Sequence, residues 1–322
     1  MRRDSPWNRG AWVKFGFKVI VTLLLVWLLL QGVDPRSVLD SALRIDRYFL
    51  AAAVGLSLCN LWLAGRRWFF VIESLGYQLP RGLVWQLTLV GAFFNQFLPS
   101  AMGGDLVRLP YAARAGLPLT AALESVVLDR IMAFVGLILV VLCCLPVAFL
   151  VIADTRAHWL LTGIVLASLL PVGLLSSLAD WPRGLSEKPV LRPVSALSRS
   201  LREALLGQQR QRILATAVLI HLTRVLTVYL IAAGMSLPIS FLACLLLVPP
   251  ALLVTNLPIS LGGWGLREGA FVAAFAFVGL PAEQSFTLSA MFGLVILCSS
   301  LAGGLVWILL RWPTDKQAAP HQ

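Results

Sequence analysis

The sequence predicts an all-α polytopic membrane protein with about eight full spans and two short segments, and three observations lead there. The chain is 59% hydrophobic and 13% charged, whereas soluble domains are about 45–50% apolar and about 25% charged. Residues 131–153, 159–179 and 225–266 carry no charge, and a helix needs roughly 20 apolar residues to cross a bilayer. These runs are continuous rather than alternating, which favours helices over a membrane barrel.

The expected spans follow one another from the N-terminus to the C-terminus. They cover residues 12–31, 48–64, 82–98, 126–152, 159–178, 213–235, 241–257 and 286–310. The first span follows a basic segment and has no small-residue cleavage site after it, so we expect an uncleaved span with the N-terminus in the cytoplasm. Arg66 and Arg67 come directly after the second span and indicate a cytoplasmic boundary there.

Residues 180–212 form the longest polar stretch and are rich in arginine. Cytoplasmic loops carry such an excess of basic residues, so we place this loop inside the cell. Within it, residues 193–206 have apolar side chains at helical spacing. They predict either an amphipathic helix on the inner leaflet or a solvated linker.

The formal net charge of +11 raises the question of nucleic-acid binding. The basic residues cluster beside the spans, however, and no basic stripe is interleaved with exposed aromatic residues, so we expect no nucleic-acid partner. The five cysteines lie inside apolar runs without metal-ligand spacing, so we expect neither a metal site nor disulfides. We also expect no cofactor and no enzyme activity, because no nucleophile–base constellation is apparent.

A motif with the pattern L-P-x-x-x-G-G-x-x-x-R occurs twice, at residues 98–108 and 257–267. Each copy is followed by a short segment, a Gly-Leu-Pro tripeptide and a long apolar run. A duplicated membrane fold with discontinuous helices leaves this kind of pattern. We therefore expect one transmembrane repeat at residues 1–157, a second at residues 158–312, and a polar tail at residues 313–322.

The positions of the basic loops bear on the orientation of these repeats. If the N-terminus, residues 66–81 and residues 180–212 are all cytoplasmic, the broken segment near Arg108 must complete a fourth crossing between the last two. Each half then has five crossings, and the repeats are inverted. If the broken segments re-enter instead, the long basic loop lies outside.

The repeated motif also carries the residues best suited to bind an anion. Pro99 and Pro258 interrupt the helical hydrogen bonding. The glycine pairs, Gly103 with Gly104 and Gly262 with Gly263, permit close approach of a ligand. Helices that restart there would direct their N-terminal amides at an anion, and Arg108 and Arg267 would add a bidentate phosphate fork. Alternatively, these arginines only pair with Asp105 and Glu268, as intramembrane charges usually do.

Four further polar residues lie near or inside the expected spans. Asn95 and Asn256 precede the prolines and could satisfy backbone groups freed at the breaks. Arg130, next to Asp129, either forms a boundary ion pair or lines a cavity entrance. Arg224 lies inside a span on the same helix face as His221, where an arginine needs a wet cavity or a carboxylate.

These motifs resemble the transmembrane, flippase-like region of the lysylphosphatidylglycerol synthase family. The similarity rests on residues 95–108, on Leu128-Asp129-Arg130 and on residues 258–269. It implies an inner-membrane protein that moves an aminoacylated, polyprenyl or hopanoid-type lipid between leaflets. Full-length synthases carry a soluble transferase domain after further spans, so we do not expect the synthase activity here.

We therefore expect an integral inner-membrane lipid flippase or scramblase whose partners are membrane lipids, anionic or lipid-phosphate. The alternative is a non-enzymatic subunit that scaffolds a lipid-modifying or glycosyltransferase complex, with a membrane transferase as its partner. A membrane-embedded transferase is a third hypothesis, and the missing base–nucleophile pair counts against it.

Overall fold

The computed structural model describes residues 36, 40, 42–97, 103–151, 154–180, 191–256 and 264–309. Within these residues the chain forms ten α-helices, one short 3-10 helix and no strand, which confirms the all-helical class. The α-helices are α3 (Arg47–Ser74), α4 (Arg81–Phe97), α5 (Gly103–Arg114), α6 (Leu119–Val151), α7 (Thr155–Ser177), α9 (Arg192–Leu206), α10 (Arg210–Gly234), α11 (Phe241–Thr255), α12 (Leu266–Ala276) and α13 (Ala282–Leu309).

Five of these helices are long and apolar enough to cross a membrane, namely α3, α6, α7, α10 and α13. Two further expected spans are helical but short: α4 has 17 residues and α11 has 15 residues. Both end just before a copy of the repeated motif. The first expected span, residues 12–31, and the polar tail lie outside the described residues.

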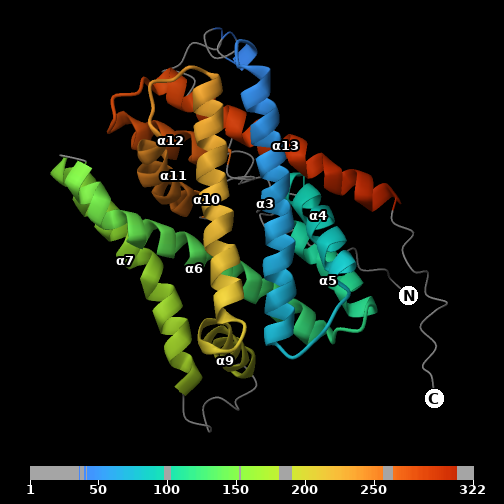
Figure 1. Ribbon diagram of the computed structural model, residues 1–322. Coiled ribbons are helices and arrows are strands. Elements are labelled where there is room, and N and C mark those ends of the chain that lie inside the picture. The colour runs from blue at the N-terminus through green and yellow to red at the C-terminus, as the bar shows by residue number, and fades with distance from the viewer. Residues whose placement is uncertain are drawn as a thin grey trace, which may run out of the picture.

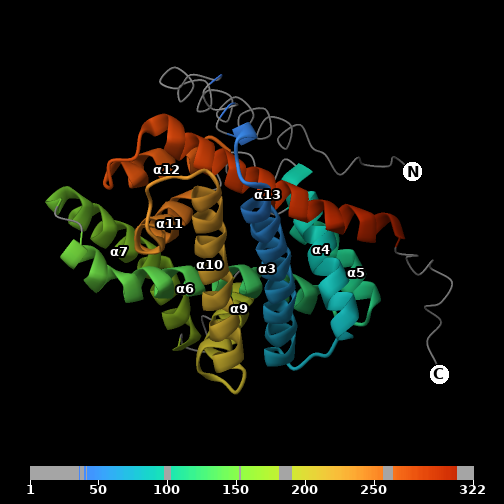
Figure 2. The same ribbon diagram turned by 45° about the horizontal axis from the view of Figure 1, so that its top comes forward.

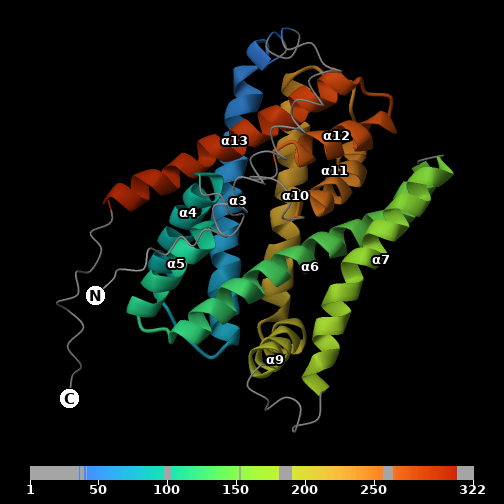
Figure 3. The same cartoon turned by 180° about the vertical axis from the view of Figure 1, so that it is seen from behind.

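The long helices α3 and α10 lie side by side at the centre of the molecule (Figure 1). Helices α4 and α5 flank α3, whereas α11 and α12 flank α10. Helices α6 and α13 cross the same face of the central pair (Figure 3), and each contacts both α3 and α10. Helix α4 also packs against α13, and α11 packs against α6.

The buried apolar side chains form two clusters. One joins the C-terminal half of α3 to α4, α9 and the start of α6, and includes Trp68 and Leu128. The other joins α11, α12 and the end of α6, and includes Phe271 and Phe292. On α3, the buried polar residues Ser57, Asn60 and Arg67 lie between Ala53 of one cluster and Trp68 of the other, so a polar layer separates the clusters along this central helix.

The expected boundary after residue 64 is wrong, because α3 continues for ten more residues to Ser74. Trp68 to Ile72 are buried and pack into the apolar core, which keeps this segment helical and inside the protein. Helix α6 likewise begins at Leu119, before the expected start of its span. Asp129 and Arg130 therefore lie well within α6 and do not open it.

The amphipathic helix expected within the basic loop is present as α9. Its Leu201 and Ala204 are fully buried and join the apolar cluster of α3 and α6. Figure 2 shows α9 beside the N-terminal end of α10, far from α13. The apolar face of α9 thus packs on the protein, whereas Arg199 and Arg202 are exposed.

Helices α5 and α12 end in the same way. Each Gly-Leu-Pro tripeptide begins with a glycine in the left-handed region, Gly116 at φ +108° and Gly279 at φ +74°. Only glycine adopts this conformation without strain. Each short helix therefore turns sharply into the long helix that follows, α5 into α6 and α12 into α13.

Candidate anion-binding site

A polar cavity of about 350 Å³ lies between the two apolar clusters. Residues from α3, α4, α5, α6, α10, α11, α12 and α13 contribute to its wall. Among the described residues, the charged side chains that line it are five arginines and two aspartates: Arg67, Arg108, Arg130, Arg224, Arg267, Asp105 and Asp129. The cavity thus combines a hydrophobic surrounding with an excess of positive charge.

Asp105 organises the first break. It lies in the first turn of α5, is 2% exposed, and accepts hydrogen bonds from Arg108 and from Nε of Arg130, the latter at 2.6 Å. The guanidinium of Arg108 lies over the indole of Trp68, 4.5 Å from the ring centroid. One carboxylate therefore holds two arginines that come from different helices.

Close packing of α5 against α4 positions this group. A Cβ on Gly104 would overlap the backbone carbonyl of Gly91, so the two helices approach as closely as they do only with glycine at this position. The Gly104 amide donates to Oδ1 of Asn95 at 2.9 Å. The expectation that Asn95 satisfies a backbone group at the break is thereby confirmed. The side-chain amide of Asn256 likewise donates to the Leu252 carbonyl oxygen in the last turn of α11, at 3.0 Å, so the expectation holds at the second break as well.

Glu268 organises the second break. Its Oε2 accepts from the Gly265 amide at 2.6 Å and caps the start of α12. Its Oε1 accepts from Nη2 of Arg267 at 2.7 Å and from the Ser289 hydroxyl at 3.3 Å. The guanidinium of Arg267 lies 4.5 Å from the ring centroid of Trp264. A Cβ on Gly293 would overlap this guanidinium, so α13 leaves room for it.

Arg67 of α3 is a buried cavity residue that the sequence analysis assigned to a membrane boundary. Its Nε donates to Oδ1 of Asp129 at 2.8 Å, and both side chains are 6% exposed. Among the buried atoms of the described chain, Nη1 of Arg67 and Nε of Arg108 have no hydrogen-bond partner. Each of these two arginines therefore retains a free N–H donor in the cavity region.

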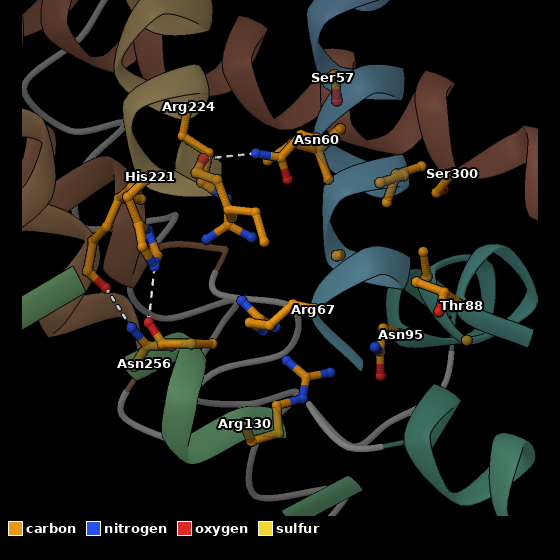
Figure 4. Close-up of a pocket in the computed structure, with 18 of the residues that line it drawn as sticks. Ser57, Asn60, Arg67, Thr88, Asn95, Arg130, His221, Arg224, Asn256 and Ser300 are labelled. Carbon is orange, nitrogen blue, oxygen red and sulfur yellow. Dashed lines mark hydrogen bonds between the residues drawn. The ribbon is translucent and has the colours of Figure 1, made fainter. Parts of the chain in front are cut away.

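Arg224 of α10 makes no hydrogen bond or ion pair with any other residue that the structure describes. Its charge is instead repelled by Arg67 and Arg130. Figure 4 shows the side chains of Arg67, Arg130 and Arg224 turned toward one common space. His221, one turn earlier, donates from Nε2 to the Ala133 carbonyl oxygen at 2.9 Å, and its Nδ1 has no partner in the described chain.

The structure brings most of the sequence-predicted site residues to one place. Arg108, Arg267, Asp105, Arg130 and Arg224 all line the cavity. Gly103, Gly104 and Glu268 are buried beside it and support the wall. Pro99, Pro258, Gly262 and Gly263 lie outside the described residues.

The geometry is compatible with both interpretations of Arg108 and Arg267, as anion-binding residues and as partners of carboxylates. Arg108 and Arg267 do bond to Asp105 and Glu268, as the structural alternative requires, and they also face the cavity. Buried guanidinium groups with free donors suit a phosphate, because the planar fork matches phosphate oxygens. No group of three or more described His, Cys, Asp or Glu residues is placed to hold a metal ion.

Comparison with known proteins places these features in a family. Residues 16–304 match the model of the lysylphosphatidylglycerol synthase TM region. A UPF0104 membrane protein of Methanothermobacter thermautotrophicus is 22% identical over 297 residues, covering 83% of this chain and 86% of that protein. The residues that match the family model, 16–304, span both breaks and the positions of all five arginines of the cavity.

Proposed function

Since the chain belongs to the lysylphosphatidylglycerol synthase transmembrane-region family and is a multi-pass integral membrane protein, we propose that it moves a phosphate-bearing lipid between leaflets. The observation that carries this proposal is the cavity lined by Arg67, Arg108, Arg130, Arg224 and Arg267. An isolated arginine in a membrane is costly. A site with this many charges is therefore expected to hold an anionic ligand.

The size and exposure of the cavity support a headgroup as the ligand. Small-molecule sites usually measure about 300–1,000 Å³, so a cavity of about 350 Å³ accommodates a headgroup but not two acyl chains. The side chain of Arg130 is 43% exposed and provides a first contact for an arriving phosphate. The headgroup passes through the polar layer while the acyl chains stay in the bilayer. No ATP-binding motif of the type G-x-x-x-x-G-K-[ST] occurs in the sequence, so we expect movement down a gradient, coupled to ions or powered by a partner protein.

We further propose that the cavity lies between two inverted repeats, one containing α3 to α6 and the other α10 to α13. The packing partners of the helices support this. Contacts of α4 with α3, α5 and α13 correspond to contacts of α11 with α10, α12 and α6. Each half also contains a short helix before the break, a buried arginine on a tryptophan, and a left-handed glycine before the next long helix.

The proposed location is the inner membrane, with the N-terminus and residues 180–212 in the cytoplasm. Single cysteines at the exposed positions Gln208 and Thr155, in a variant without the native cysteines, test this orientation in whole cells. An impermeant maleimide should label position 155 from outside and leave position 208 unlabelled. Labelling of position 208 from outside contradicts the inverted arrangement.

The transport proposal is tested with purified protein in liposomes that contain fluorescent lipids. Dithionite quenching of the outer leaflet reports how fast labelled lipids exchange. We expect exchange of an anionic or polyprenyl phosphate lipid that is faster than in empty liposomes and strongly slowed by Arg108→Gln and by Arg267→Gln. Arg199→Gln on the exposed face of α9 is the matched control and should exchange lipid at the unsubstituted rate.

Exchange no faster than in empty liposomes for every anionic and polyprenyl lipid would overturn the transport proposal. That result would favour a subunit that scaffolds a membrane transferase. Unchanged exchange in both Arg108→Gln and Arg267→Gln would separate transport from this cavity.

A further inference from the structure

The charges around the cavity do not balance within the described chain. Five arginines line it, and the carboxylates bonded to them are Asp105, Asp129 and Glu268. Asp105 serves two arginines at once, because both Arg108 and Arg130 bond to it. The described site therefore holds two more cationic than anionic groups.

The surplus is concentrated on one side of the cavity. Arg224 has no carboxylate partner in the described chain, and its burial, together with the repulsion from Arg67 and Arg130, raises the cost of keeping its charge there. Arg67 retains a free Nη1 donor, and Arg130 uses Nε on Asp105 at 2.6 Å. These three side chains come from α3, α6 and α10 and point into the same space (Figure 4).

A ligand that neutralises this surplus needs two negative charges. A terminal phosphate, esterified once, carries up to two negative charges above its second pKa of about 6, and it presents three acceptor oxygens. Three oxygens suit three guanidinium groups that approach from three helices. A phosphodiester headgroup has one charge and two free oxygens, and an aminoacylated headgroup adds a cation to a site that is already positive.

We propose that the site selects lipids that end in a phosphate monoester, with Arg67, Arg130 and Arg224 surrounding the terminal phosphate. This inference rests on the proposed function, since it names the class of lipid that the cavity would carry. Arg224 is the residue that most clearly has no structural task within the described chain. Its removal is therefore the sharpest way to separate ligand recognition from folding.

The test compares two lipids with identical tails in detergent solution at pH 8, dioctanoyl phosphatidic acid and dioctanoyl phosphatidylmethanol. The first has a terminal phosphate and the second a methyl phosphodiester. We expect the terminal phosphate to bind about ten-fold more tightly or better, in line with hydrogen bonds to charged groups. Arg224→Gln should reduce this preference to about two-fold or less, while Arg199→Gln should retain it.

Thermal unfolding without lipid provides the folding control. Because Arg224 is repelled by its neighbours, Arg224→Gln should unfold at the same temperature as the unsubstituted protein or higher. Arg224→Lys keeps the charge but lacks the planar fork, so its preference should lie between those of the other two proteins. A preference that is unchanged in Arg224→Gln overturns the assignment of this residue.

Failure of this inference differs from failure of the transport proposal. Equal binding of both lipids, together with protein-dependent leaflet exchange, overturns selection of the terminal phosphate and leaves transport standing. Tighter binding of an aminoacylated lipid than of dioctanoyl phosphatidic acid also overturns selection of the terminal phosphate and leaves transport standing. Absence of both binding and exchange for every lipid overturns the two proposals together.

Discussion

The two breaks bury their arginines in similar surroundings but connect them to the protein differently. At the first break, Asp105 bonds to Arg108 and to Arg130 of α6, and the tryptophan beneath Arg108 comes from α3. At the second break, Glu268 and Trp264 belong to the same short segment as Arg267. The side chains that bond to Arg108 or pack on it at the first break thus come from several helices. At the second break, most of the contacts of Arg267 come from α12 and the residues just before it.

The two copies of the repeated motif therefore have different roles. Asp105 lines the cavity, whereas Glu268 lies behind Arg267 and caps α12. A ligand that displaces Arg130 from Asp105 changes contacts between α5 and α6. A ligand at Arg267 leaves the bonds of Glu268 to Gly265 and Ser289 in place.

The largest expected effect is that of Gly104→Ala at the first break. Its Cβ would overlap the Gly91 carbonyl, which is backbone and cannot move aside, so we expect a loss of more than about 4 kcal/mol of unfolding free energy, or failure to fold. Size-exclusion profiles and thermal unfolding in detergent measure this. Gly55→Ala on α3 is the control, because a Cβ there meets nothing within 4 Å.

The carboxylates give the next largest effect and test the comparison directly. Asp105→Asn leaves the buried Arg108 and the partly exposed Arg130 without a full negative charge, so we expect a loss of about 3–5 kcal/mol. Glu268→Gln leaves one such arginine and keeps a side-chain acceptor for the Gly265 amide, so its loss should be smaller. Thermal unfolding of both variants checks the order.

Adding Arg130→Gln to Asp105→Asn should restore part of the stability, because only one arginine then lacks its partner. A larger loss from Glu268→Gln than from Asp105→Asn would contradict the assigned difference between the breaks.

The smallest expected effect concerns the tryptophans beneath the arginines. Trp68→Phe removes the stronger cation–π partner and the bond from its Nε1 to the Ser125 hydroxyl at 3.2 Å, so we expect a cost of about 1–2 kcal/mol. Trp264→Phe only replaces an indole by a phenyl ring, which is a weaker cation–π partner, and should cost less than about 1 kcal/mol. Unfolding temperatures that fall equally would show that the hydrogen bond of Trp68 adds nothing.

Much of the fold was predictable because lipid-facing helices leave long apolar runs in the sequence. All seven expected spans that fall on described residues are helices. The repeated motif predicted that Arg108 and Arg267 would contribute to one site, and both line the same cavity. The repeat made these residues visible because two matching patterns are far more informative than one.

Arg67 was missed for a physical reason. It follows Arg66, and two adjacent arginines after an apolar run are typical of a membrane boundary. Its partner Asp129 lies 62 residues further along the chain, so no local pattern shows that Arg67 turns inward while Arg66 lies over the rings of Trp62 and Phe70. The placement of Arg224 beside Arg67 depends in the same way on the packing of α3 against α10.

The shortness of α4 and α11 has a consequence for the surrounding lipid. Helices of 17 and 15 residues rise about 26 and 23 Å, less than the roughly 30 Å of a bilayer's hydrocarbon core. Lipids beside a short hydrophobic segment compress to match it. In the proposed transport, a headgroup that crosses beside these helices would therefore meet a thinner apolar barrier than it would in undisturbed bilayer.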